Sequence, residues 1–94
     1  MLPKDEIKRI QALTSVDRNF YQRQMMEAVA AQTRGISREE LYEKSGTTTE
    51  DRFRLHLGIL QGLGLVTSVE PYELTPFGRH ILQQLRALHR QLSP

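Results

Sequence analysis

Residues 38–53 read REELYEKSGTTTEDRF, and this stretch decides the fold because it predicts two helices joined by a tight turn. Ser37 before it and Glu40 three residues later form the pattern of a capping box. Gly46 predicts the end of the first helix, since glycine readily takes the left-handed conformation found there. Residues 47–49 are all threonine and are candidate caps for the helix that follows.

That second helix is predicted from about residue 49 to residue 63, with a capping box from Thr47 and Glu50 or from Thr48 and Asp51. At about 100° per residue, its apolar side chains share one side, which is expected to face the core: Phe53, Leu57, Leu60 and Leu63. The opposite side is expected to face outward and holds Arg54, Gly58 and Gln61, with Asp51 and Gly62 at its edge and Leu55 on its boundary.

Toward the N-terminus, apolar residues recur every third position and predict a helical face: Ile7, Ile10, Leu13 and Val16. Thr14 or Ser15 then either caps a new helix or lies at a bend within one long helix. Helical spacing continues from there to Gly35, which is expected to end the segment.

Toward the C-terminus, Gly64 is expected to stop the helix, and residues 65–69 then alternate between apolar and polar as a half-buried strand does. Residues 72–75 predict a second short strand, so the two form a hairpin. Thr75 and Pro76 mark the start of a last helix, expected to reach about residue 92, because proline is favoured at the first helical position.

Composition indicates one domain of ordinary globular type, because the chain has 94 residues, 38% of them hydrophobic and 26% charged. No cysteine is present, so disulfides and thiolate metal sites are excluded. No apolar run approaches the ~18 residues of a membrane span, and the charged start lacks the apolar core of a signal peptide. A cytoplasmic protein without membrane contact is expected.

The net charge is +2, and its basic excess lies in residues 74–94, which hold Arg79, Arg86 and Arg90 and no acid. These arginines are expected to contact phosphate beside a binding site, to pair with acids of a partner, or only to keep the surface solvated. The sequence leaves these three uses open.

Three stretches together resemble the winged helix-turn-helix domain of small bacterial and archaeal regulators of the ArsR and MarR type. They are REELYEKSGTTTEDRF, HLGILQGLGLV and YELTPFGRHIL, which resemble the helix-turn-helix, the end of its second helix, and the last wing strand with the following helix. The resemblance implies a mainly α fold with a small β-hairpin, as one domain over residues 1–94 with extra N- and C-terminal helices. Its helix-turn-helix is expected at about 37–63, its wing at about 65–75 and its C-terminal dimerisation helix at about 76–92.

The resemblance also implies a homodimeric transcriptional regulator that inserts the helix of residues 49–63 into the major groove of double-stranded DNA. Arginine suits guanine, and threonine suits phosphate or a thymine methyl group. The expected DNA-binding residues are Thr48, Thr49, Arg52, Arg54, Leu55, Gly58 and Gln61. The alternative is that Arg52 and Arg54 only form surface ion pairs with Asp51 or Glu50, which are worth less than about 1 kcal/mol.

Gly58 and Gly62 need an explanation, because each costs about 1 kcal/mol relative to alanine in a helix interior. Their spacing of four makes a smooth strip that admits a DNA backbone or a helix of another protein, or that relieves crowding against a neighbouring loop. His56 lies in the apolar arc, which favours a partly buried structural histidine over a base reader.

The last helix carries a heptad-like apolar stripe that runs past what a small domain can cover, which predicts a homodimer. The expected interface residues are Ile7, Ile10, Leu13, Ile81, Leu85, Leu88 and Leu92. Alternatively, the first and last helices cover each other within one chain.

A second function class is a winged-helix module for protein–protein interaction, favoured by the acids Glu70 and Glu73 in the expected wing and by the glycine strip. An enzyme is not expected, because no nucleophile–base pair or phosphate-binding loop is present at a usable spacing. No cofactor or metal is expected either, since His80 and His89 lie nine residues apart and lack a ligand spacing.

Overall fold

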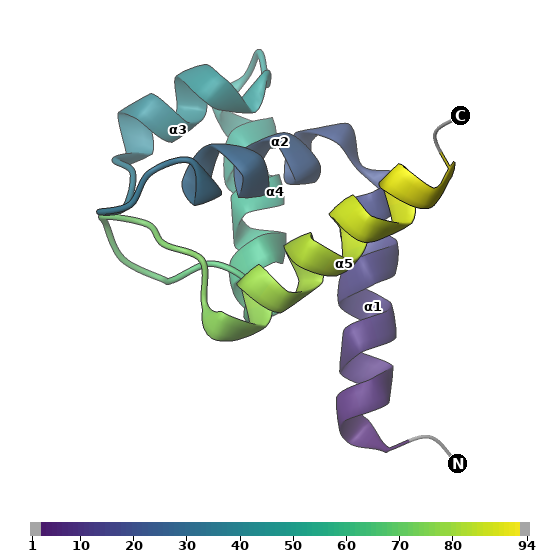
Figure 1. Cartoon of the computed structure of the whole chain (residues 1–94). Helices are drawn as coiled ribbons and strands as arrows, with labels where there is room; N and C mark the ends of the chain where they lie inside the picture. Colours follow the sequence, from purple (N-terminus) through teal and green to yellow (C-terminus); the bar gives the residue numbers. More distant parts are fainter. Residues whose placement is uncertain (1–2, 93–94) are drawn as a thin grey trace.

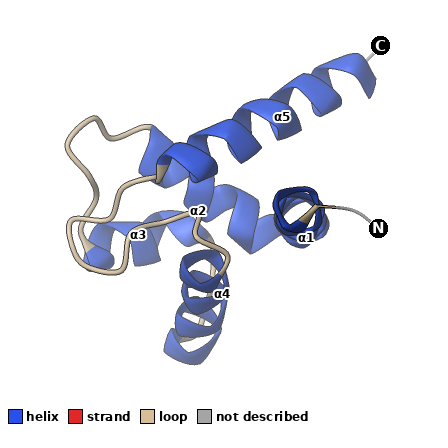
Figure 2. Cartoon of the chain, turned by 90° about the horizontal axis from the view of Figure 1, so that it is seen from below, coloured by secondary structure: helices blue, strands red, loops and turns tan. Residues whose placement is uncertain are grey.

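The computed structural model describes residues 3–92, and its regular structure consists of five helices. In chain order they are α1 (Lys4–Arg18), α2 (Phe20–Ala30), α3 (Arg38–Ser45), α4 (Glu50–Gly62) and α5 (Pro76–Leu92). α2 lies at the centre and packs against each of the other four helices (Figure 1). Seen from below, α4 projects to one side of α2 and α5 crosses on the other side (Figure 2). The two helices that carry the predicted functions therefore lie on opposite sides.

The helical segment is interrupted at Asn19, between α1 and α2, so both expectations for Thr14 or Ser15 are wrong: neither residue caps a new helix or lies at a bend. Asn19 is extended, with φ −124°, and its side-chain oxygen accepts the backbone N–H of Gln22 at 3.0 Å. This bond satisfies one of the N–H groups that the start of a helix leaves unpaired. α2 ends at Ala30 with Ala31 as its C-cap, so the expectation that Gly35 ends this segment is wrong.

The α3–turn–α4 unit follows local signals that the sequence carries. Ser37 caps α3 by accepting the N–H of Glu40 at 3.2 Å, and Gly46 ends it with φ +81°; both predictions are confirmed. α4 is capped by Thr49, whose hydroxyl accepts the N–H of Arg52 at 3.2 Å. The capping boxes predicted for Thr47 and Thr48 are wrong, because Thr49 is the N-cap of α4. Thr47 is buried, and its hydroxyl pairs with that of Ser45 at 2.7 Å.

Residues 65–75 do not form the predicted β-hairpin, and the winged helix-turn-helix fold expected from the sequence is therefore wrong. Among the described residues 3–92 no segment is a strand. The only pairing in that part of the chain is two isolated antiparallel bridges, one between Ile36 and Tyr72 and one between Val66 and Leu74. The connection between α4 and α5 is a loop, and the fold is all-helical.

The hydrogen bonds of this loop explain why the alternating pattern does not become a ladder. The N–H of Thr67 reaches the carbonyl of Glu73 at 2.9 Å, but the N–H of Glu73 is taken by the Thr67 hydroxyl at 3.0 Å. A side chain thus replaces the carbonyl that a regular strand pair needs. Val69, expected to be half-buried, is 73% exposed and adds no packing energy to a strand.

All five helices and the loop between α4 and α5 contribute buried apolar side chains to one core. The apolar side predicted for α4 is confirmed, since Phe53, Leu57 and Leu60 are buried and Leu63 packs partly against them. The last helix begins as predicted, with Thr75 Oγ1 accepting the N–H of Gly78 at 2.9 Å. The remaining large buried side chains include Val16, Met25, Met26, Val29, Ile36, Leu41, Leu65, Ile81, Leu82 and Leu85.

Candidate functional site

The outer side of α4 is the surface that the sequence predicts as a site, and it faces solvent on the projecting helix (Figure 2). Thr48, Arg52 and Arg54 are exposed at or near its N-terminal end. Thr49 is also exposed, but its hydroxyl is engaged as the cap of α4. Leu55 is 58% exposed on the same helix, an unusual exposure for leucine on a helix that also supplies the core.

The charges on this side are only weakly compensated. Arg54 Nη2 lies 2.9 Å from Asp51 Oδ1, with the two side chains 64% and 91% exposed. A pair this exposed is worth less than about 1 kcal/mol, so a phosphate can displace it. Arg52 forms no ion pair within the described residues. Glu50 pairs instead with Arg38, which ties the start of α3 to the start of α4.

Gly58 and Gly62 face open space. A Cβ atom built at either position has no heavy atom within 4 Å. Crowding against a neighbouring loop, one of the three explanations weighed from the sequence, is therefore excluded within the described chain. The two glycines and Leu55 leave a smooth, uncharged strip along the outer side of α4.

Gln61 is the member of the predicted DNA-binding set that the structure assigns to another task. Its Nε2 donates to the backbone carbonyl of Thr67 at 3.0 Å, and the side chain is half-buried. The amide therefore anchors the loop that follows α4, so the prediction that it reads DNA is not supported by its geometry. Helix periodicity predicted an outward side chain, because it does not show that the loop after α4 folds back against Gln61.

His56 is half-buried on the inner side of α4, in agreement with the structural role expected for it. Its ring lies 5.5 Å from that of Tyr21, and its Nδ1 lies 3.3 Å from Nε2 of Gln22. Burial lowers the pKa of His56, and the positive charge of Arg52 lowers it further. The imidazole thus joins α4 to the first turn of α2 in its neutral form.

One acid of the expected wing has a structural role that the sequence did not reveal. Glu70 Oε2 accepts the backbone N–H of Arg38 at 2.9 Å, so the loop carboxylate caps the start of α3. A carboxylate is favoured there by the partial positive charge of a helix N-terminus. Glu70 therefore helps to hold the start of α3 against this loop.

The residues predicted for dimerisation divide into two groups. Ile81 and Leu85 are 0% and 3% exposed in the core of their own chain, which removes them from a surface between chains. Leu13 packs partly against that core. Ile7, Ile10 and Leu88 remain exposed, at 41%, 44% and 44%. Leu92 ends α5, and its side chain lies outside the described residues.

A groove between α2 and α5 is a feature that sequence reasoning missed. It has a volume of about 550 Å³, and its lining comes from residues about sixty positions apart in the chain. The lining residues are Phe20, Arg23, Gln24, Glu27, Leu82, Leu85, Arg86, His89 and Arg90. Helical spacing within each helix was visible in the sequence, but nothing there indicated that α2 and α5 face each other.

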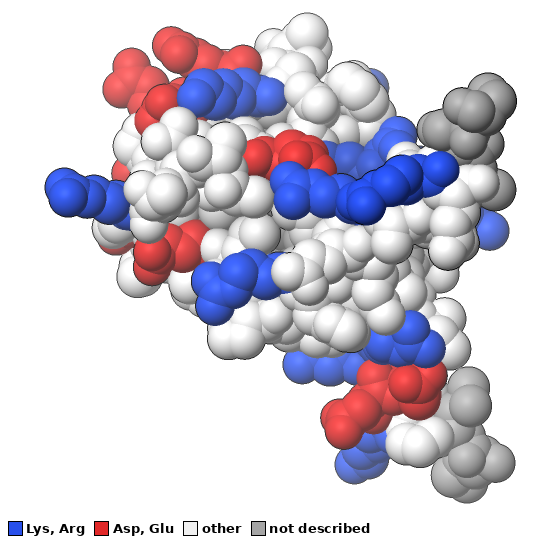
Figure 3. Space-filling model, in the orientation of Figure 1, with Lys and Arg blue, Asp and Glu red and all other residues white. Residues whose placement is uncertain are grey.

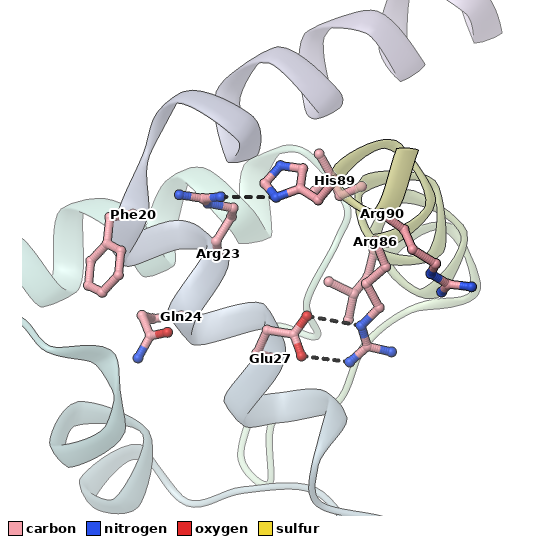
Figure 4. Close-up of a pocket in the computed structure, with 9 residues that line it drawn as sticks. Phe20, Arg23, Gln24, Glu27, Arg86, His89 and Arg90 are labelled. Carbon is pink, nitrogen blue, oxygen red and sulfur yellow. Dashed lines mark hydrogen bonds and ion pairs between the residues drawn. The ribbon is translucent and has the colours of Figure 1, made fainter. Parts of the chain in front are cut away.

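Two polar bridges cross this groove (Figure 4). The Glu27 carboxylate accepts hydrogen bonds from Nε and Nη2 of Arg86, with N···O distances of 3.0 and 2.6 Å. This bidentate pairing raises the pKa of Arg86. Arg23 Nη1 lies 3.5 Å from Nδ1 of His89, whose Nε2 lies 3.0 Å from Asp17 Oδ1. Basic side chains also gather over the C-terminal half of α5 in the space-filling view (Figure 3).

Among residues 3–92 no helix has the length and apolar character needed to cross a membrane, and no three His, Cys, Asp or Glu side chains converge as a metal would require. No family model, curated protein or solved structure matches this chain.

Proposed function

We propose that this chain is a DNA-binding protein that places the outer side of α4 in the major groove of double-stranded DNA. The observation that carries the proposal is the exposure of that side on a projecting helix. Arg52 and Arg54 supply positive charge near its start, and Gly58 and Gly62 leave its middle open.

The dimensions and chemistry of α4 support this placement. Its 13 residues span roughly 20 Å, and a B-DNA major groove, about 12 Å wide, admits one helix. Arg52 and Arg54 suit phosphate or guanine, and Thr48 suits phosphate. The missing Cβ atoms at Gly58 and Gly62 let the helix backbone approach the duplex more closely than other residues allow.

We further propose that the protein acts as a homodimeric transcriptional regulator in the cytoplasm. α1 and α5 pack on each other within the chain, yet Ile7, Ile10 and Leu88 keep 41–44% of their surface exposed. The N-terminal part of α1 extends beyond the rest of the molecule (Figure 1). A second copy that covers these side chains gives two α4 helices, one for each half-site of a two-fold symmetric DNA site.

Binding to random duplex DNA at two salt concentrations tests the DNA proposal. We expect affinity to fall steeply with salt, because each neutralised phosphate contributes about −0.9 to the slope of log K against log salt. Arg52→Ala and Arg54→Ala should each weaken binding and reduce that slope by about 1. Arg79→Ala is the matched control, because Arg79 is an exposed arginine on α5, on the other side of the molecule.

A specific observation favours a second candidate function, the docking of another protein on α4. Leu55 is 58% exposed beside the open glycine strip, and an apolar side chain with small neighbours suits helix packing. If a well-folded protein shows no DNA binding at low salt, the DNA proposal is wrong and this alternative is favoured. Equal weakening by Arg79→Ala also contradicts groove insertion, because it indicates diffuse charge attraction.

The homodimer has a separate test. Sedimentation across a concentration series should give a dimer for the wild-type chain and a monomer for Ile10→Lys and Leu88→Lys. Leu55→Lys is the matched control, because Leu55 is equally apolar and even more exposed but lies on α4. A monomer at all concentrations, or a monomer caused by Leu55→Lys alone, contradicts assembly through the terminal helices.

A further inference from the structure

The groove between α2 and α5 has the size and composition of a small-molecule site. Its volume of about 550 Å³ falls within the roughly 300–1,000 Å³ of ligand pockets. Leu82 and Leu85 supply its apolar floor, and Phe20, 58% exposed, stands at one end (Figure 4). An aromatic ring with this exposure on a short helix offers a flat apolar surface that the chain itself does not cover.

The charges of the groove are not balanced. Three arginines line it, and its single acid, Glu27, already accepts hydrogen bonds from Nε and Nη2 of Arg86. Arg90 lies one turn beyond Arg86 and makes no ion pair within the described residues. One anion therefore faces three cations, and the groove attracts negative charge.

Arg23 shows where an anion is missing. Its Nε is buried and has no hydrogen-bond partner. Its Nη1 lies 3.5 Å from Nδ1 of His89, so an imidazole ring and not a carboxylate lies next to this guanidinium. A partly buried guanidinium whose Nε has no acceptor is energetically unfavourable.

We propose that the α2–α5 groove binds a small carboxylate with an apolar body, the carboxylate accepting hydrogen bonds from Arg23. Arg90 lines the same groove and adds positive charge to it, but its guanidinium points away from that of Arg23 (Figure 4). The apolar body packs mainly on the exposed ring of Phe20, above the small parts of Leu82 and Leu85 that line the groove. Planar, bidentate recognition of a carboxylate is what the guanidinium fork favours. Phe20 and Arg23 are three residues apart on α2, so one ligand can contact both.

This site is separate from the surfaces proposed above. α4 lies on the other side of the molecule (Figure 2), and Leu88 points about 100° away from His89 around α5. The groove stays open in a dimer that covers Leu88, and the inference stands whether or not α4 binds DNA.

Calorimetric titration of the full chain with 4-phenylbutyrate, without DNA, tests the inference. We expect binding at least about tenfold tighter than that of the uncharged 4-phenylbutan-1-ol, because a charge-assisted hydrogen bond is lost with the alcohol. Butyrate and inorganic phosphate should bind more weakly than 4-phenylbutyrate, because they lack the apolar body. Equal binding of the alcohol, or of phosphate, contradicts a site for an apolar carboxylate.

Variants locate the binding. Arg23→Gln should weaken binding of 4-phenylbutyrate by about tenfold, because a charge-assisted hydrogen bond is lost. Arg90→Gln should weaken it by about threefold, because only an exposed positive charge is lost. Arg79→Gln, on the same helix as Arg90 but outside this groove, should leave binding unchanged. Arg90 is exposed, so its variant keeps the test valid even if Arg23→Gln unfolds the chain. Absence of binding by the folded wild-type chain, or binding unaffected by Arg90→Gln and by a folded Arg23→Gln, overturns the proposal.

Discussion

The first turn of α5 and the outer side of α4 both place glycine inside a helix, but the surroundings of that glycine differ completely. At Gly78 a Cβ atom would lie 2.0 Å from the carbonyl oxygen of Leu65, whereas at Gly58 and Gly62 it would meet nothing within 4 Å. Gly78 is needed because the loop packs onto the helix. No packing contact within the described residues requires Gly58 or Gly62 to lack a side chain.

Gly78→Ala is expected to have the largest effect. The Leu65 carbonyl cannot move away freely, because it also accepts the N–H of Thr75 at 3.0 Å. We expect a loss of about 3 kcal/mol or more, a large share of the roughly 5–14 kcal/mol typical for a chain of this length. Urea unfolding followed by circular dichroism measures it. An unchanged midpoint would mean that the loop does not pack on α5 in this way.

Gly58→Ala should act in the opposite direction and by less. Because the added methyl group meets no neighbour, it should raise the free energy of unfolding by about 1 kcal/mol through helix propensity. If the open strip serves close approach to DNA, the same variant should weaken DNA binding while it stabilises the fold. Stabilisation with unchanged affinity for DNA would show that this strip does not contact the duplex.

The smallest expected effect concerns the inner side of α4, where burial and the Arg52 charge lower the pKa of His56. The unfolded chain then binds more protons than the folded chain once the pH falls below about 6.5. The free energy of unfolding should therefore decrease from pH ~7.5 toward pH ~5.5. His56→Gln should lose this part of the decrease, as urea unfolding at several pH values measures. An identical pH dependence in both proteins would contradict the burial of His56.

Several signals carried by a few adjacent residues predicted the structure, although the capping boxes at Thr47 and Thr48 and the cap or bend at Thr14 or Ser15 were wrong. Ser37 caps α3, Gly46 ends it, and Thr75 with Pro76 starts α5, because caps and left-handed stops depend on neighbouring backbone groups alone. The core side of α4 followed equally from periodicity, because Phe53 anchors a stripe that one helix can define.

Predictions that needed a partner from elsewhere in the chain failed or were never made. The alternating residues 65–69 had no neighbouring strand to complete a ladder, and one hydroxyl, that of Thr67, replaced a carbonyl. Leu85 and Leu88 belong to one apolar stripe in the sequence, yet the first is buried and the second exposed, since only part of α5 lies over the core.

The sequence by itself determined the outline of α3, α4 and α5, the caps at Ser37, Gly46 and Thr75, and which side of α4 is apolar, because these depend on contacts within a few residues. Only the tertiary structure decided that Gly78 packs directly against the backbone of Leu65, whereas Gly58 faces open space. It also decided that Arg23 and Arg90 line one groove. Those outcomes depend on which helices lie against one another, and the packing of α2 against α5 joins residues about sixty positions apart.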